Sequence, residues 1–95
     1  RLGGDEFIMI MPDTSRQHAE EMAETIIDSI KEAIHHSFGS VGENVTVSIG
    51  ISLAPDDGVD LDSLYKQADI ALYTAKEKGK NQYQFYQFSN NHQAM

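Results

Sequence analysis

The alternation of hydrophobic and polar positions predicts three strands along the chain. Residues 7–11 form a continuous apolar run, which predicts a strand buried on both faces with neighbours on either side. Residues 45–52 alternate between branched apolar and small side chains, and residues 82–88 alternate between aromatic and polar ones, so both are predicted strands. Because the second face of the middle strand carries only small residues, we expect another element to pack closely on it.

Two longer stretches carry apolar residues at steps of three and four, the spacing of one helix face. The first lies within residues 13–39, and the second follows a turn-forming loop at residues 54–60. The predicted buried stripes are Ala19, Met22, Ala23, Ile26, Ile27, Ile30, Ala33 and Ile34, and then Leu61, Leu64, Ala68, Ala71, Leu72 and Ala75. The residues that can cap these helices are Asp13, Thr14 or Ser15 with Gly39, and Asp60 or Asp62 with Gly79.

The predicted order is strand, helix, strand, helix, strand. Alternating elements of this kind indicate an α/β or α+β fold in which both helices pack on a sheet. With 95 residues the chain makes one domain at most, and its polar end, residues 89–95, is expected to be a frayed tail or a linker.

Composition and charge exclude several classes of function. A formal net charge of −8 would repel a nucleic-acid backbone, so no nucleic-acid partner is expected. The absence of cysteine excludes disulfides and thiolate metal sites, and it is compatible with a reducing compartment such as the cytoplasm. No apolar run approaches the about 20 residues of a membrane helix, so no membrane contact is expected from this segment. A local cluster of Lys66, Lys76, Lys78 and Lys80 can still hold a small anion such as a nucleotide phosphate.

The sequence opens with a glycine pair followed by two carboxylates. Gly3 and Gly4 can form a two-residue hairpin turn or let the backbone approach a ligand closely. Asp5 and Glu6 are hard oxygen ligands that suit a magnesium ion holding phosphates. Taken alone, the same four residues are also typical of a polar hairpin tip, and this alternative stays open.

A second candidate cluster lies where the second helix ends. Lys76 and Lys80 can both bind phosphate oxygens, but lysines near a helix C-terminus also stabilise the helix dipole, with Gly79 as the cap. The four histidines, His18, His35, His36 and His92, lack a diagnostic metal-binding spacing, so no ligand role is expected for them.

Four segments in a characteristic order resemble GGDEF-domain diguanylate cyclases. They are "RLGGDEF" with the apolar strand after it, "VTVSIGIS", "ADIALYTAKEKGKN" and "QYQFY", which together cover roughly residues 1–86. This resemblance favours the functional interpretation of both clusters. It implies a palm-like α+β fold of the nucleotide-cyclase type, with helices on a mainly antiparallel sheet. Residues 1–88 would be the C-terminal part of such a domain, without its earlier strand, and we expect that part alone to bind GTP poorly and to be inactive.

The resemblance also implies a reaction and a role for each candidate residue. The family condenses two GTP molecules into cyclic di-GMP and two pyrophosphates, with Mg²⁺ or Mn²⁺ as the cofactor and a homodimer of domains supplying the two substrates. Gly3 and Gly4 would lie against the nucleotide, and Asp5 and Glu6 would bind metal and support catalysis. Lys76 and Lys80 would bind phosphates. Lys80 stands where the family commonly has arginine, which replaces a planar, bidentate donor by a point charge.

Two other functions remain open. A GGDEF domain can bind GTP and regulate a neighbouring domain without synthesis, and the segment "YQFYQFSNNHQAM" is similar to the connection that precedes an EAL phosphodiesterase domain. Alternatively, the chain is a structural fragment without activity of its own.

Overall fold

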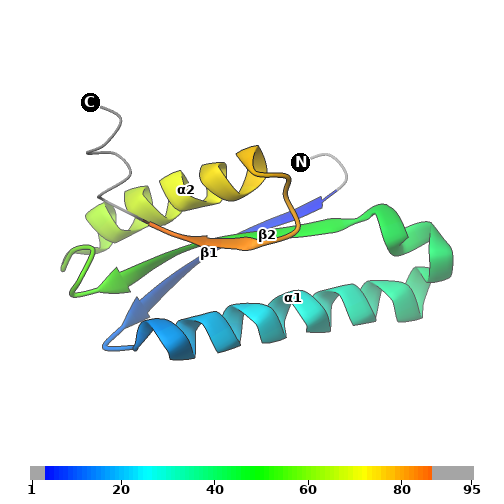
Figure 1. The fold of residues 1–95 in the computed structure, drawn as a ribbon, viewed down its shortest axis with the longest axis horizontal. Coiled ribbons are helices and arrows are strands. Elements are labelled where there is room, and N and C mark those ends of the chain that lie inside the picture. The colour runs from blue at the N-terminus through cyan, green and yellow to red at the C-terminus, as the bar shows by residue number, and fades with distance from the viewer. Residues whose placement is uncertain (1–3, 87–95) are drawn as a thin grey trace.

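The predicted order of elements is confirmed by the fold in Figure 1. The computed structural model describes residues 4–86, apart from the side chains of residues 4, 5 and 42–44. The elements are β1 (Gly4–Pro12), α1 (Arg16–Phe38), a 3-10 helix η1 (Gly39–Asn44), β2 (Thr46–Ala54), α2 (Leu61–Glu77) and β3 (Tyr83–Phe85). Neither α-helix combines the length and the hydrophobicity that crossing a bilayer requires, within the residues described.

The sheet of the described residues is parallel, with the strand order β1-β2-β3. The first pair runs in register from Gly4 opposite Thr46 to Pro12 opposite Ala54. The expectation of a mainly antiparallel sheet is therefore wrong for this part of the chain. The physical reason is the connectivity, because α1 joins β1 to β2 and α2 joins β2 to β3. A helical crossover returns the chain to the starting end of the sheet, so each strand enters in the same direction.

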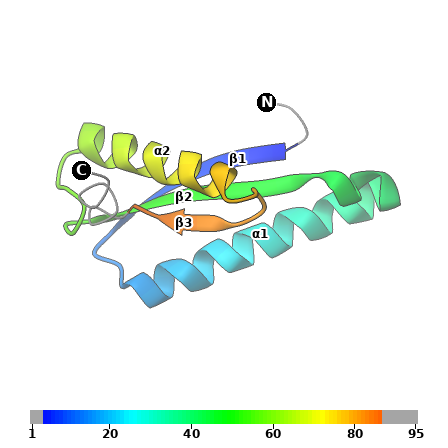
Figure 2. The ribbon, with the colours of Figure 1, turned by 45° about the horizontal axis from the view of Figure 1, so that its top comes forward.

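The two helices cover opposite faces of the sheet (Figures 1 and 2). On the α1 face the core consists of large aliphatic residues of β2 packed against two alanines of the helix. Its buried members are Ala19, Ala23, Val47, Ile49, Ile51, Leu53 and Phe85. On the α2 face, the buried residues of β2 are the small Ser48, Gly50 and Ser52. The strand alternation predicted from the sequence therefore separates an aliphatic face from a small-residue face.

Strand β1 is less buried than its apolar sequence predicts. It lies at one edge of the described sheet, Phe7 is 39% exposed, and residues 8–11 are half-buried. Of the two neighbours predicted for this strand, the described residues supply one, because within residues 4–86 only β2 pairs with it. The core on the α1 face is built around β2, and among the described hydrophobic residues of β1, Met9 and Met11 pack against it, each partly buried.

The buried stripes of both helices are shorter than their periodicity predicts. In α1, Met22 is exposed. Ala33 is also exposed, in the last third of the helix, which extends past the core. In α2, Leu61 is 69% exposed because it is the first residue of the helix, whereas the other five stripe positions are buried. Periodicity gives the inward direction of a helix face, but it does not give the extent of the surface beneath it.

Side-chain caps define where the helices begin. The Ser15 hydroxyl accepts a hydrogen bond from the backbone N–H of His18 (3.1 Å), and the Asp60 carboxylate accepts one from that of Ser63 (3.0 Å). This bond holds the pKa of Asp60 below its usual value of 3.8. Gly39 follows α1 with a φ of 61°, as the sequence predicted for a helix end.

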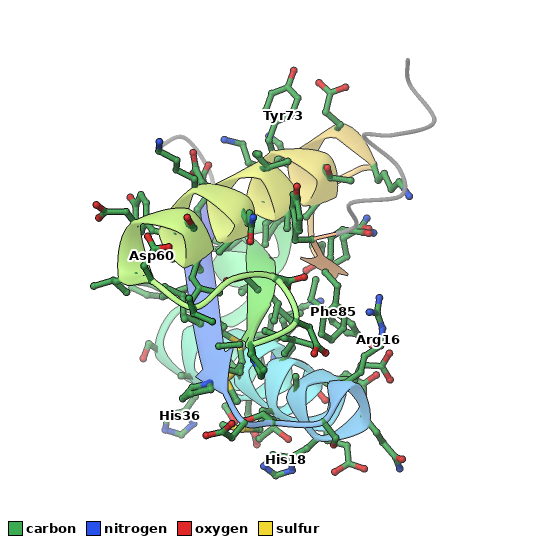
Figure 3. All side chains as sticks on the ribbon, turned by 90° about the vertical axis from the view of Figure 1, so that its left-hand side faces the viewer. Arg16, His18, His36, Asp60, Tyr73 and Phe85 are labelled. Carbon is green, nitrogen blue, oxygen red and sulfur yellow. The ribbon has the colours of Figure 1, made fainter. Side chains whose placement is uncertain are left out.

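The short strand β3 is fastened to α1 by two side-chain contacts. The Arg16 guanidinium lies 4.2 Å from the centre of the Phe85 ring, an arrangement visible at the lower right of Figure 3. The Tyr83 hydroxyl donates a hydrogen bond to Glu24 (3.1 Å). Desolvation and this carboxylate raise the pKa of Tyr83 above its usual value. Thus β3, with three residues, is held by α1 as well as by its pairing with β2.

Candidate functional site

Helix α2 lies directly on the backbone of β2, and Gly50 makes this contact possible. A Cβ atom at position 50 would collide with the carbonyl oxygen of Ala68 and the backbone nitrogen of Leu72. The Ser52 hydroxyl donates a hydrogen bond of 2.8 Å to the carbonyl of Leu64, so a side chain also joins the two elements. The expected close packing on the small-residue face is confirmed, and it fixes α2 both across and along β2.

The C-terminal end of α2 is closed by a pair of backbone hydrogen bonds. The N–H of Lys80 donates to the carbonyl of Ala75 (2.9 Å), and the N–H of Gly79 donates to that of Lys76 (3.3 Å). This is the Schellman arrangement, which requires a left-handed residue, and Gly79 supplies a φ of 117°. The predicted role of Gly79 as a helix stop is confirmed. The bonds also define the path of the backbone that carries both candidate lysines.

The turn after α2 is anchored to the beginning of β2. The backbone N–H of Asn81 donates to the Ser48 hydroxyl (3.3 Å), and the N–H of Ile49 donates to the carbonyl of Gln82 (3.0 Å). Ser48 is buried and lies opposite Glu6 in the β1–β2 register. The C-terminal end of α2 is therefore placed over the N-terminal ends of β1 and β2, where the signature segment begins.

An ion pair joins the two candidate clusters at this position. Lys76 Nζ lies 3.2 Å from Glu6 Oε2, and the two side chains are 36% and 37% exposed. A pair this exposed contributes only about 0–1 kcal/mol to stability, so the fold does not depend on it. The contact matters for the chemistry of the site, because it brings a carboxylate from β1 and an ammonium group from α2 together at a position that solvent can reach.

The other predicted site residues are placed less completely. Gly3 and the side chain of Asp5 lie outside the part of the chain that the structure describes, whereas the backbone of Gly4 begins β1. Lys80 is exposed in the anchored turn with a φ of 64°. Of the predicted residues, the structure thus brings Glu6 and Lys76 together, whereas Lys80 lies in the turn that follows α2.

Ser48 is a site-forming residue for which the sequence analysis predicted no role. It accepts the hydrogen bond that ties the turn of Lys80 and Asn81 to β2. The signal in the sequence is its place on the small-residue face, a pattern that by itself predicts only close packing. A serine at such a position also offers a polar anchor once a backbone N–H lies above it.

Within the described side chains, no group of three histidine, cysteine or acidic residues could hold a metal ion. Glu6 supplies one carboxylate, and the Lys76 ammonium already occupies a cation position beside it. The donor chemistry at Glu6 therefore suits a cation, with Asp5 as the neighbouring carboxylate in the sequence.

The chain matches a known protein family over residues 1–82, and the family is described as "Diguanylate cyclase, GGDEF domain". It is 43% identical over 91 residues to the signaling protein YkoW of Bacillus subtilis, a match that covers 94% of this chain and 11% of YkoW. No solved structure matches the chain.

Two other relatives have names that state an activity. The chain is 36% identical over 83 residues to the cyclic di-GMP phosphodiesterase PdeR of Escherichia coli, covering 87% of this chain and 12% of PdeR. It is 37% identical over 91 residues to the bifunctional diguanylate cyclase/cyclic di-GMP phosphodiesterase MucR of Pseudomonas aeruginosa, covering 96% and 13%. The chain thus spans about a tenth of the length of these three relatives.

Proposed function

Because the chain belongs to the GGDEF family, we propose that the complete protein is a diguanylate cyclase in cyclic di-GMP signalling. It condenses two GTP molecules, each held by one domain of a homodimer, into cyclic di-GMP and two pyrophosphates. The observation that carries this proposal is the 3.2 Å contact between Glu6 of the signature strand and Lys76 of α2. A strand that begins with carboxylates and a helix that ends with ammonium groups together provide ligands for a metal-bound triphosphate.

Each residue has a distinct task in this proposal. Lys76 and Lys80 attract the phosphates at a helix C-terminus, whose dipole alone would repel them. Gly3 and Gly4 allow the nucleotide to lie against the backbone, and Asp5 and Glu6 would hold Mg²⁺ or Mn²⁺. When bound there, the metal ion would neutralise phosphate charge and stabilise the attacking and leaving oxygens.

The reaction breaks one phosphoanhydride bond for each phosphodiester bond that it forms. The 3′-hydroxyl of one GTP attacks the α-phosphorus of the other, loses its proton, and the bridging oxygen leaves with pyrophosphate. The second attack closes the ring. The task of the protein is to align the two nucleotides, and this alignment requires that α2 keep a fixed position on the sheet. Residues 1–95 alone are not expected to turn over GTP.

A second candidate function is a domain that binds GTP and regulates a neighbouring phosphodiesterase domain without synthesis. The observation that favours it is the named activity of PdeR, a cyclic di-GMP phosphodiesterase whose match covers 87% of this chain and 12% of PdeR. An intact carboxylate pair, Asp5 and Glu6, favours the cyclase instead.

Incubation of the complete protein with GTP and Mg²⁺, followed by chromatographic detection of the products, separates the two functions. A cyclase forms cyclic di-GMP, and Asp5→Ala abolishes the product, whereas Asp28→Ala, an exposed carboxylate of α1, retains it. Bound GTP without any product would support the regulatory domain and exclude the cyclase. Unchanged synthesis by Asp5→Ala would refute the assignment of this residue.

A further inference from the structure

The Glu6–Lys76 ion pair joins two residues that the proposed function assigns to different ligands. Glu6 would bind a cation and Lys76 would bind phosphate, yet in this structure they bind each other at 3.2 Å. Lys76 comes from the last turn of α2 and Glu6 from the beginning of β1, so the contact joins two elements of the fold. About a third of each side chain is exposed, so ligands can reach both charges.

The close packing of α2 on β2 fixes the backbone positions from which the two side chains of this contact extend. Gly50 leaves no space between α2 and β2, and Ser48 anchors the turn that follows the helix. Lys76 and Glu6 therefore begin from backbone positions that are fixed relative to each other. Only their side-chain torsions have to change to separate the charges, because both side chains are flexible and partly exposed.

We infer that this ion pair couples the binding of the metal ion to the binding of the nucleotide, an inference that rests on the proposed function. A metal ion arriving alone must displace the Lys76 ammonium from Glu6 and then tolerate that positive charge nearby. A triphosphate arriving alone must draw Lys76 away and leave the Glu6 carboxylate unpaired beside its own negative charge. When both ligands bind, Glu6 exchanges the Lys76 ammonium for the metal cation, and Lys76 exchanges the Glu6 carboxylate for the phosphate anion.

The coupling is reciprocal by thermodynamic linkage. If the nucleotide strengthens metal binding by some factor, the metal strengthens nucleotide binding by the same factor, and such factors are typically about 5–150-fold. The site would accordingly select the metal–nucleotide complex over either component. Removing the Lys76 charge should strengthen the binding of the metal ion alone, and removing the Glu6 charge should strengthen the binding of the nucleotide alone. Loss of a ligand group without such coupling would instead weaken binding.

The test is calorimetric titration of the complete protein with Mn²⁺ alone, with GTP in the presence of a chelator, and with both together. A GTP analogue that cannot release pyrophosphate replaces GTP in the combined titration. Lys76→Met should bind Mn²⁺ alone more tightly, and Glu6→Gln should bind metal-free GTP more tightly, each by about threefold. The matched controls are Lys31→Met and Glu32→Gln, which alter exposed charges of α1 and should follow the wild type.

The outcomes distinguish this inference from the proposed function. If the wild type binds the metal–nucleotide pair but Lys76→Met and Glu6→Gln leave single-ligand binding unchanged or weaker, the coupling role is wrong and the proposed function stands. If the wild type binds no nucleotide under any condition, the proposed function fails and this inference fails with it. Tighter single-ligand binding in both variants, together with a smaller coupling factor, supports the inference.

Discussion

The two faces of the sheet hold their helices in different ways. On the α2 face, Gly50 brings the helix backbone onto the strand backbone, and a hydroxyl joins Ser52 to Leu64. On the α1 face, aliphatic side chains such as Ile49 and Ile51 fill the space against Ala19 and Ala23. The first contact fixes a helix in position, whereas the second mainly buries apolar area and tolerates an exposed helix end.

This difference agrees with what the two helices carry. Lys76 of α2 must meet Glu6 of β1, so a small displacement of α2 would separate the candidate site residues. Helix α1 carries none of the proposed site residues. The comparison predicts that changes on the α2 face affect both stability and ligand binding, whereas changes on the α1 face affect stability alone.

Gly50→Ala should have the largest effect on the fold. The added methyl group meets backbone atoms of Ala68 and Leu72, which cannot move independently of the helix. We expect a loss of about 3 kcal/mol in the free energy of unfolding, measured by urea denaturation of this chain. Gly39→Ala is the control, since it has a free environment but a φ of 61°, and it should lose only about 1 kcal/mol. Equal losses would show that the α2 face is not specially tight.

Ile49→Val tests the opposite face with a change of the same size. It removes one carbon from a fully buried residue, beside the position where Gly50→Ala adds one. The surrounding side chains can relax, so the expected loss is about 1 kcal/mol in the same denaturation experiment. Nucleotide binding by the complete protein should not change. A loss as large as that of Gly50→Ala would remove the contrast between the faces.

Arg16→Gln should have a smaller effect, limited to the attachment of β3. It removes a cation that lies 4.2 Å from the centre of the Phe85 ring in a partly exposed position. The expected loss is about 0.5 kcal/mol, together with faster hydrogen exchange at the β3 amides. Exchange that increases in α2 instead of β3 would contradict the assigned contact.

The smallest predicted effect depends on pH and distinguishes the two helix caps. Because the Ser63 N–H lowers the pKa of Asp60 in the folded state, its ionised form adds stability above its usual pKa of 3.8, which is lost as the pH falls through the lowered value. Asp60→Asn should therefore be less stable than the wild type at neutral pH, and the difference should vanish in acid. Ser15→Ala should lose stability at every pH, because its hydroxyl does not titrate. Thermal melts across this range measure both.

Much of the fold could be predicted from local patterns, because caps and periodicity act over a few residues. Gly79 and the alternation around Gly50 were sufficient to predict a helix end and a close contact. The strand direction came from the family resemblance, not from the residues, and it is wrong for the described residues. The exposure of Leu61 and Phe7 depends on what lies beside them, which no local pattern contains.

The candidate site was predictable in composition but not in geometry. The signature and the lysine cluster named Glu6 and Lys76, yet the pattern along the chain could not show that they touch. Their contact depends on how α2 sits on β2, which is set by Gly50 and by the bond from Asn81 to Ser48. Contacts between residues far apart in the sequence follow from how the elements pack. Here the small residues of β2 are the sequence feature that indicates this packing.

We propose that the close packing of α2 on β2 places Lys76 in a nucleotide site at the beginning of the signature strand. The most direct test is the affinity of the complete protein for a GTP analogue with Mg²⁺, measured for Lys76→Met and Lys78→Met. Both variants lose one lysine charge at the end of the same helix. We expect a loss of about tenfold or more for Lys76→Met and little change for Lys78→Met, because in the described structure Lys76 pairs with Glu6 of the signature strand and Lys78 does not. Equal affinities for the two variants would contradict this proposal.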